Sequence, residues 1–393
     1  MRQFHGMALP LKYNVRNVLI RWRATLATIL GVALVVAVYV LMEAMAAGLE
    51  KSSQNTGDPR NIMVVRKGST AESSSQVTRE QYKNLLYLEQ VARNAKGQPL
   101  VSADMVVLIN LPRTGGKGEA NVLMRGVTPA GLELRPQVQL VNGRWFRPGA
   151  REVVVSKRLA QRFANFQIGG RFRTGGKELT ITGWMDGGNS AFDSEVWMDA
   201  DEARAIFERE SYSSVLMRVA DGIEPKALAQ RIESDKRLPV RAELETLYYA
   251  AQTKTAGPIK FLGVILATAM SIGAVFAAMN TMYASVGGRT REIGTLRVLG
   301  YRRRTILIGF LIEGAFLSFI GGCLGCLLSL GMHGYSVGTM SFESFSEVVF
   351  HFRITPMLIL KGLVFAVVVG ILGSFLPALR ASRLPVIAAL KSV

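Results

Sequence analysis

The chain has 393 residues, of which 49% are hydrophobic and only 19% charged, and its formal net charge is +18. A soluble domain usually has about 25% charged residues, and the mean hydropathy here is +0.24, so these values argue against a purely soluble enzyme. The apolar residues and the positive charges are distributed unevenly, and the elements they predict are taken in chain order below.

The first 23 residues are basic and precede a long apolar stretch. Apolar residues recur at helical spacing from Leu11 to Trp22, which predicts an amphipathic helix at the membrane surface over residues 1–23. The stretch 24–47 is long enough to cross a bilayer, which needs roughly 20 helical residues. It is also longer than the apolar core of a cleavable secretory signal, usually about 7 to 15 residues, so we expect it to be retained as the first span.

The region 48–257 that follows has mixed charge, with 30 Lys and Arg against 24 Asp and Glu. It begins with the pattern strand 61–66, helix 78–93 and strand 100–111, and a second strand-helix-strand pattern runs from 214 to 241.

Between these two patterns the sequence is rich in glycine and in short β-rich runs. We therefore expect an α+β subdomain, 48–111 with 205–257, split by a mostly β insertion at 112–204.

Three more stretches are apolar enough to be transmembrane helices, at residues 258–288, 305–332 and 354–379. Because a bilayer holds no water to satisfy a free backbone, each must be a helix. The expected fold class is a polytopic α-helical membrane protein with four transmembrane helices and an α+β extracytoplasmic domain inserted between the first and the second.

The charges that flank the spans predict the orientation of the chain. Residues 1–23, the loop 289–304 and the tail 380–393 together hold 14 Lys and Arg against one acidic residue. Lys and Arg beside membrane spans are retained on the cytoplasmic side. Both termini are thus expected in the cytoplasm, and the large domain and the loop 333–353 outside the cell inner membrane.

The sequence holds no motif that predicts catalysis. Gly116-Lys117 and Gly176-Lys177 lack the other residues of a phosphate-binding loop, and His5, His333 and His351 lie far apart without a second metal ligand nearby. The positive charge is not clustered on a soluble module, so no nucleic-acid partner is expected. We expect no enzyme activity, no metal and no cofactor in this chain.

The most informative segment is the basic loop between the second and third spans, GRTREIGTLRVLGYRRR at 288–304. Residues 290–299 predict a short amphipathic helix with Ile293, Leu296 and Leu299 on one side, which Gly300 would end. Gly294 costs about 1 kcal/mol relative to alanine inside a helix, which favours a close approach of another backbone. On composition alone, a basic turn that only enforces topology explains the loop equally well.

Several motifs together resemble the FtsX-like permease domain of the MacB type. They are Arg291-Glu292-Ile293-Gly294 with Arg297 and Gly300, Glu313-Gly314, the glycines from Gly321 to Gly325, Arg16-Asn17 and Pro377-Ala378. In the outer domain, Gly143-Arg144-Trp145-Phe146 is similar to part of that family's periplasmic core domain. The resemblance covers essentially the whole chain.

The resemblance implies a permease subunit of an ATP-binding cassette export complex of the type VII, mechanotransmission kind, whose outer subdomains are called porter and sabre. In that family the loop between the second and third spans is a coupling helix docked on an ATPase. The implied partners are a separate ABC ATPase that binds the ATP, a second permease copy, a periplasmic membrane-fusion or adaptor protein with an outer-membrane channel, and membrane lipid. Because no fused nucleotide-binding domain is found, we expect the ATPase on another polypeptide.

Carried over to this sequence, the resemblance assigns roles to six loop residues. Polar contacts to the ATPase are expected from Arg289, Arg291, Glu292 and Arg297, and Gly294 and Gly300 are expected to shape the helix. Within the spans, we expect Glu313 to pair with a basic group or to snorkel, and Asn280 to form an interhelical hydrogen bond.

Two other functions remain open on the sequence. One is a non-transporting, FtsX-like regulator of an envelope hydrolase, which the large β insertion disfavours. The other is a membrane-anchored receptor or adhesion module that needs no nucleotide.

Overall fold

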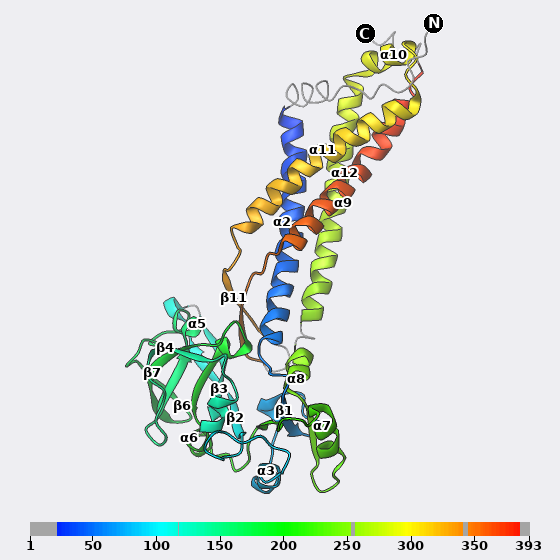
Figure 1. Ribbon diagram of the computed structural model, residues 1–393. Helices are drawn as coiled ribbons and strands as arrows, with labels where there is room; N and C mark the ends of the chain where they lie inside the picture. The colour runs from blue at the N-terminus through cyan, green and yellow to red at the C-terminus, as the bar shows by residue number, and fades with distance from the viewer. Residues whose placement is uncertain (1–21, 117, 253–255, 341–344, 386–393) are drawn as a thin grey trace. The chain divides into compact units, whose positions relative to one another are not determined.

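The computed structural model describes residues 22–116, 118–252, 256–340 and 345–385. The chain divides into two compact units (Figure 1). The helical unit comprises residues 1–46, 258–335 and 352–393, and the outer unit comprises residues 47–257 with 336–351. The predicted surface helix lies outside the described residues, except for its last two positions.

Four helices are long and apolar enough to cross a membrane. They are α2 (Trp22–Gln54), α9 (Ala256–Gly287), α11 (Arg303–Leu330) and α12 (Pro356–Ser382). The first continues seven residues beyond the predicted end of its span. Pro258 lies in the first turn of α9, where a proline is tolerated because the first N–H groups of a helix have no partner within it.

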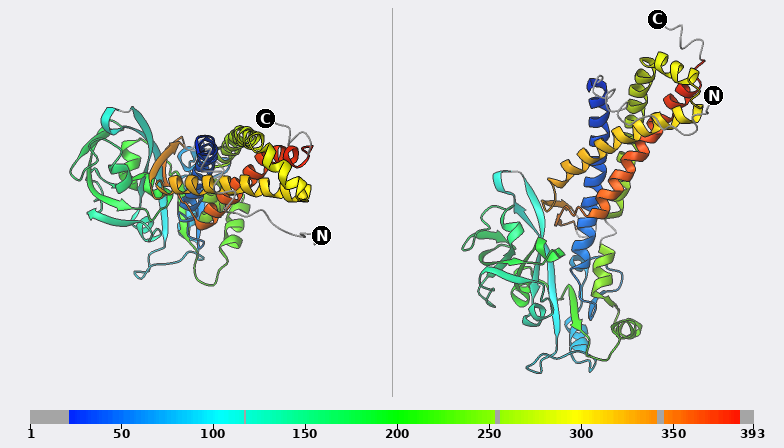
Figure 2. Two further views of the ribbon diagram at one scale, coloured as in Figure 1. Left: turned by 90° about the horizontal axis from the view of Figure 1, so that it is seen from above. Right: turned by 45° about the horizontal axis from the view of Figure 1, so that its top comes forward.

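Glycines allow α11 to approach its neighbours closely within the helical unit, which Figure 2 shows from two further directions. A Cβ atom on Gly314 would collide with the side chain of Ser374 in α12. A Cβ atom on Gly325 would lie 2.5 Å from the carbonyl oxygen of Ala33 in α2. Small residues at such contacts are typical of helices packed in a membrane, which explains the glycines between 314 and 325.

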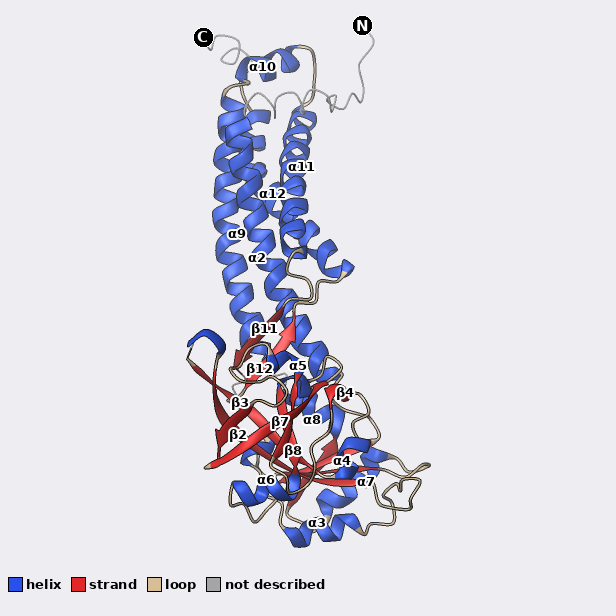
Figure 3. Cartoon of the chain, turned by 90° about the vertical axis from the view of Figure 1, so that its left-hand side faces the viewer, coloured by secondary structure: helices blue, strands red, loops and turns tan. Residues whose placement is uncertain are grey.

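The outer unit is built on one ten-stranded sheet in the order β10-β1-β9-β2-β3-β8-β5-β7-β4, with β6 paired to β7. Figure 3 shows the strands of this unit in red. The strands are β1 (Asn61–Arg66), β2 (Val101–Pro112), β3 (Glu119–Val127), β4 (Gln139–Gly143), β5 (Glu152–Ser156), β6 (Arg171–Thr174), β7 (Lys177–Asp186), β8 (Glu195–Asp199), β9 (Ser214–Arg218) and β10 (Val240–Leu244). β2 pairs with β9 over residues 101–104 and with β3 over 105–112. The long strand β2 therefore belongs to both halves of the sheet. One half contains β10, β1 and β9, and the other contains β3, β8, β5, β7, β4 and β6.

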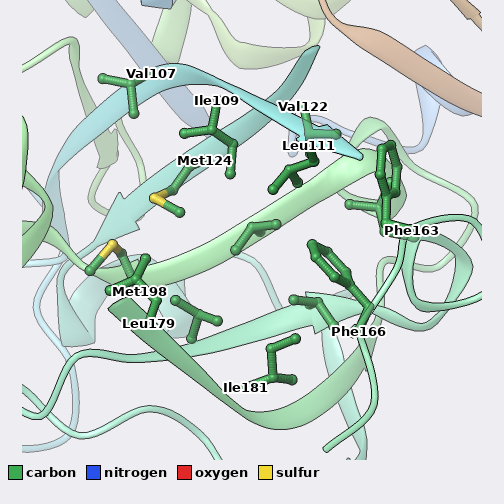
Figure 4. Close-up of a cluster of buried hydrophobic side chains, with 14 of the residues drawn as sticks. Val107, Ile109, Leu111, Val122, Met124, Phe163, Phe166, Leu179, Ile181 and Met198 are labelled. Carbon is green, nitrogen blue, oxygen red and sulfur yellow. The ribbon is translucent and has the colours of Figure 1, made fainter. Parts of the chain in front are cut away.

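Each half of the sheet has its own core. Ile62, Val64 and Val215 belong to the core on the β1-β9 half, and Val107, Met124 and Ile181 to the core on the β3-β7 half (Figure 4). The short helices of the outer unit are α3 (Arg79–Leu86), α4 (Pro129–Glu133), α5 (Lys157–Ala160), α6 (Ala200–Ile206), α7 (Pro225–Ser234) and α8 (Glu245–Gln252).

The predicted helix 78–93 was too long, since α3 ends at Leu86. Leu88 and Val91 continue the helical spacing, but Val91 forms a β-bridge with Val219, and Ala92 N–H donates to the Arg218 carbonyl. Pairing with β9 thus overrides the local helical pattern.

The connection between α11 and α12, expected to be a simple loop, contains a hairpin that belongs to the outer unit. Its strands are β11 (Ser336–Met340) and β12 (Glu347–His351). Glu347 forms ion pairs with Arg113 and Arg162. Val349 is fully buried in the β3-β7 core, and its N–H donates to the Ser194 hydroxyl at 2.7 Å. Both charge and apolar burial hold this hairpin, hereafter the docked hairpin, against the insertion.

A buried charge cluster lies where the two halves of the sheet meet. The guanidinium of Arg125 donates to Glu72 and Glu195 at 2.8–2.9 Å and to Asp104 at 3.2 Å. Burial alone would raise the pKa of Glu72, but the charge and hydrogen bonds of Arg125 outweigh it, so that this pKa lies below its usual value. These residues come from β2, β3, β8 and the turn Glu72–Ser74, so the cluster ties four segments together.

We predict that Arg125→Gln destabilises the outer unit by about 3–5 kcal/mol, because it leaves buried carboxylates without a cation. Without Arg125 the pKa of Glu72 should rise, so the loss should be larger at pH 8 than at pH 5. Thermal unfolding at both pH values measures the effect. Arg93→Gln, at an exposed arginine, is the control, and an equal loss at both pH values would contradict the electrostatic explanation.

Candidate functional site

The candidate site is the short helix α10 (Thr290–Val298), which lies between α9 and α11 at one end of the helical unit (Figures 1 and 3). Gly300 follows it with φ +93°, in the left-handed region that favours glycine. Gly300 N–H donates to the Arg297 carbonyl at 3.2 Å, and Tyr301 N–H to the Leu296 carbonyl at 3.1 Å. These two bonds form a Schellman motif, so Gly300 ends the helix as predicted.

The inner face of α10 is packed against the ends of the long helices. Ile293 is 2% exposed and lies in a cluster with Met282 of α9, Ile306 and Phe310 of α11, and Ala378 of α12. Gly294 beside it is also buried. This apolar contact fixes which side of α10 faces the bundle.

A buried ion pair fastens the start of α10 to α11. Arg289, the residue before α10, donates through Nη1 to Glu313 Oε2 at 3.0 Å, and both side chains are about one-tenth exposed or less. The same guanidinium lies over the ring of Phe310, 5.4 Å from its centroid, and 3.4 Å from Glu292. Of the two alternatives for Glu313, the structure therefore has the ion pair, and its partner is Arg289.

The outer face of α10 combines charge with exposed apolar side chains. Arg291 and Thr295 are exposed, Glu292 is 49% exposed, and Val298 and Leu299 are 60% and 67% exposed. Arg302, Arg303 and Arg304 follow after Gly300 and Tyr301 and are exposed as well. We call Arg291, Glu292, Thr295, Val298 and Leu299 the outer face of α10.

Two of the arginines expected to contact a partner also have contacts within the chain. Arg289 is held by Glu313, and Arg297 donates to the Tyr301 carbonyl at 3.3 Å across the end of α10. Arg291 and Glu292 lie where an outside partner can reach them.

The predicted grouping of Ile293, Leu296 and Leu299 on one side was wrong for Leu299. A helix turns by about 100° per residue, so six residues place Leu299 about 120° from Ile293. Val298 and Leu299 are adjacent apolar residues on the side turned away from Ile293. This pair could have predicted an exposed apolar surface from the sequence.

Asn280 of α9 is exposed, and among the described residues no hydrogen bond from it to another helix is found. The hydrogen bond between α2 and α9 is made instead by the next residue, because Thr28 Oγ1 donates to Thr281 Oγ1 at 2.8 Å. The two positions lie about 100° apart around the helix, so the neighbour of the predicted residue faces α2.

Comparison with known families matches nearly the whole chain. The model of the MacB-like periplasmic core domain matches residues 24–235, more than half of the chain. The model of the FtsX-like permease C-terminal domain matches residues 264–386, which include most of α9 and all of α10, α11 and α12.

Similar proteins carry the name macrolide export ATP-binding/permease protein MacB. The one from Hahella chejuensis is 32% identical over 203 residues, 50% of this chain and 30% of that protein. The one from Brucella abortus is 32% identical over 193 residues, 48% of this chain and 28% of that protein. The chain thus spans less than a third of the length of these two relatives.

Two solved structures are similar to part of the chain. The extracellular domain of the ABC-type transporter YknZ from Gram-positive bacteria covers 47% of this chain and 99% of its own, at 15% identity and a TM-score of 0.35. The periplasmic region of MacB from Actinobacillus actinomycetemcomitans covers 49% and 92%, at 11% identity and a TM-score of 0.37.

We predict that Arg289→Gln and Glu313→Gln are strongly coupled. Either single change should lower the thermal unfolding temperature in detergent, because it leaves one buried group without its partner, at a cost of about 3–5 kcal/mol. The double variant should lose clearly less than the two single losses added together. Glu292→Gln, at the half-exposed neighbour, should change little, and additive losses would show that the ion pair does not fasten α10.

Proposed function

Because the chain belongs to the MacB/FtsX-like family of ABC transporter permeases, we propose that it is the permease subunit of an ATP-driven export complex. We further propose that the outer face of α10 is the surface that an ABC ATPase binds. The observation that carries this assignment is the two-sided character of α10, whose inner face is fastened to the bundle while its outer face presents exposed apolar and charged side chains.

The chemistry of the outer face fits a protein partner better than lipid or water. Val298 and Leu299 are exposed apolar side chains at the end of α10, and exposed arginines lie near them in the sequence, at 291 and 302–304. A desolvated apolar centre with a polar rim is typical of protein interfaces. The expected partner surface is an apolar groove edged by acidic residues.

The proposed orientation places α10 and both termini in the cytoplasm and the outer unit on the periplasmic side of the inner membrane. The flanking arginines and lysines support this orientation. In this proposal, the ATPase bound at the outer face of α10 would bind and hydrolyse the ATP.

A pair of permease chains is the proposed working unit, because the chain offers one α10 helix and ABC ATPases act in pairs. The exposure of Asn280 supports a second copy beside α9. A polar side chain in a span is costly when it faces lipid, and α9 is the least covered span, 22% buried against 39–44% for the other three.

Movement of α10 can reach the outer unit through α11. Arg289 and Glu313 connect α10 to α11, and α11 is followed by the docked hairpin, which Glu347 and Val349 hold on the insertion. We propose that this route, beside the chain connections through α2 and α9, transmits ATP-driven movement to the periplasmic side. The cargo would be handled there, and an adaptor protein with an outer-membrane channel would complete the export path.

We predict that Val298→Asp with Leu299→Asp abolishes the association with the cognate ATPase, because a charge cannot be buried in an apolar groove without a partner. Both positions are exposed, so thermal stability should change little. Co-purification with the ATPase measures the effect. Tyr87→Asp, at a 78% exposed residue of the outer unit, is the control.

Retained association with the ATPase in the double variant would contradict the proposed contact. If the complex isolated from native membrane contains no ATPase, an adhesion module is favoured. If it contains only a cell-wall hydrolase, a regulator is favoured.

We predict that Glu347→Gln uncouples ATP hydrolysis from export. The loss of charge weakens the pairs with Arg113 and Arg162 and should loosen the docked hairpin, whereas α10 is untouched. ATPase activity of the complex should therefore persist while export falls several-fold. Glu178→Gln, in the exposed pair with Arg171, is the matched control, and an export rate equal to that of the unchanged chain would rule out the hairpin as a transmitter.

A further inference from the structure

Two segments of the outer unit, the one that follows α2 and the one that leads toward α9, are joined to each other. Ser53 at the end of α2 donates its hydroxyl to the carbonyl of Tyr249 in α8. Gly57 lies so close to the start of α8 that a Cβ atom there would be 2.7 Å from Thr246 N. We call residues 53–61 and 245–252, which meet here, the paired segments.

The side chain of Glu245 lies at the centre of this contact. It is 1% exposed and is the first residue of α8. Its Oε2 accepts from Asp58 N–H and from Asn61 Nδ2, each at 2.9 Å. Its other carboxyl oxygen is buried and has no hydrogen-bond partner within the described residues.

The charged groups around Glu245 are committed to other partners. Arg135, the cation that attracts it most strongly, donates to Asp104 and to the Gly131 carbonyl. Arg218 of β9 donates to Asp58 and Asn61. The other titratable or charged groups on the surrounding elements are Glu72, Arg125, Arg241, Glu243, Tyr248 and Tyr249.

Glu245 is protonated readily because it is buried and no ion pair within the described residues holds its carboxylate. Burial raises the pKa of Glu245 to about 7, and Glu72 adds to this, while Arg135 and the two N–H donors oppose it. A carboxyl whose pKa is higher in the closed arrangement than in water takes up a proton as the contact closes. Closure is thus favoured at acidic pH and weakens as the pH rises through 7.

We propose that Glu245 makes a pH-sensitive contact between the paired segments. The contact is stable when the carboxyl is neutral and weakens when the carboxyl is ionised. The ionised form leaves a buried charge that only water can satisfy, so it favours arrangements in which water reaches the carboxyl. The inference concerns the outer unit alone and is independent of the proposed export function.

Hydrogen exchange tests this pH-sensitive contact. The full chain in detergent is followed by mass spectrometry, and the exchange rates are corrected for the intrinsic rates. For peptides covering 56–61 and 245–252, protection should fall about tenfold from pH 6 to pH 8, as a pKa near 7 in the closed form requires. Unchanged protection of these peptides in the unmodified chain would overturn the proposal.

Two variants separate this cause from a general effect of pH. Glu245→Gln keeps the neutral shape and the acceptor oxygen, so its protection should be the same at both pH values. Glu243→Gln removes a partly exposed carboxylate two residues away that pairs with Arg241 at 3.1 Å, and it should keep the tenfold fall. A fall of similar size in Glu245→Gln would also overturn the proposal, and the measurement on the unmodified chain decides it if that variant does not fold.

Discussion

The pairing of Arg289 with Glu313 is the interaction on which the functional interpretation depends. A carboxylate in a membrane span and an arginine beside it are each costly alone, and together they remove the cost and determine where α10 begins. The apolar contact of Ile293 then fixes the rotation of α10 about its axis. With both constraints in place, Val298 and Leu299 have no site within the described helical unit and are left exposed.

Buried charged groups in the outer unit are also paired with opposite charges. Arg125 holds carboxylates from separate segments, and Glu347 draws the hairpin from between α11 and α12 onto two arginines. Glu245 is the exception, since its burial is compensated by N–H donors but by no cation of its own. That difference explains why one buried acid can respond to pH while the others serve as fixed attachments.

Local patterns predicted the spans and most strands, because an apolar run in lipid or an alternating strand is specified by adjacent residues. They failed where distant segments decide. Val91 leaves the helical pattern to pair with Val219, and the hairpin joins a sheet core formed more than a hundred residues earlier in the chain. In α10, the sequence identified the helix and Gly300, but only packing against α11 showed which arginines remain available to a partner.

The docked hairpin also decides which fragment of this protein is a complete folding unit. A soluble piece containing only residues 47–257 would lack Val349 and Glu347, although both belong to its interior. Such a piece would expose an apolar hollow and two uncompensated guanidinium groups, which invites self-association. Appending the strand pair 336–351 through a linker would restore the missing interior, so the natural boundary of the periplasmic module is set by contacts in space and is discontinuous in the chain.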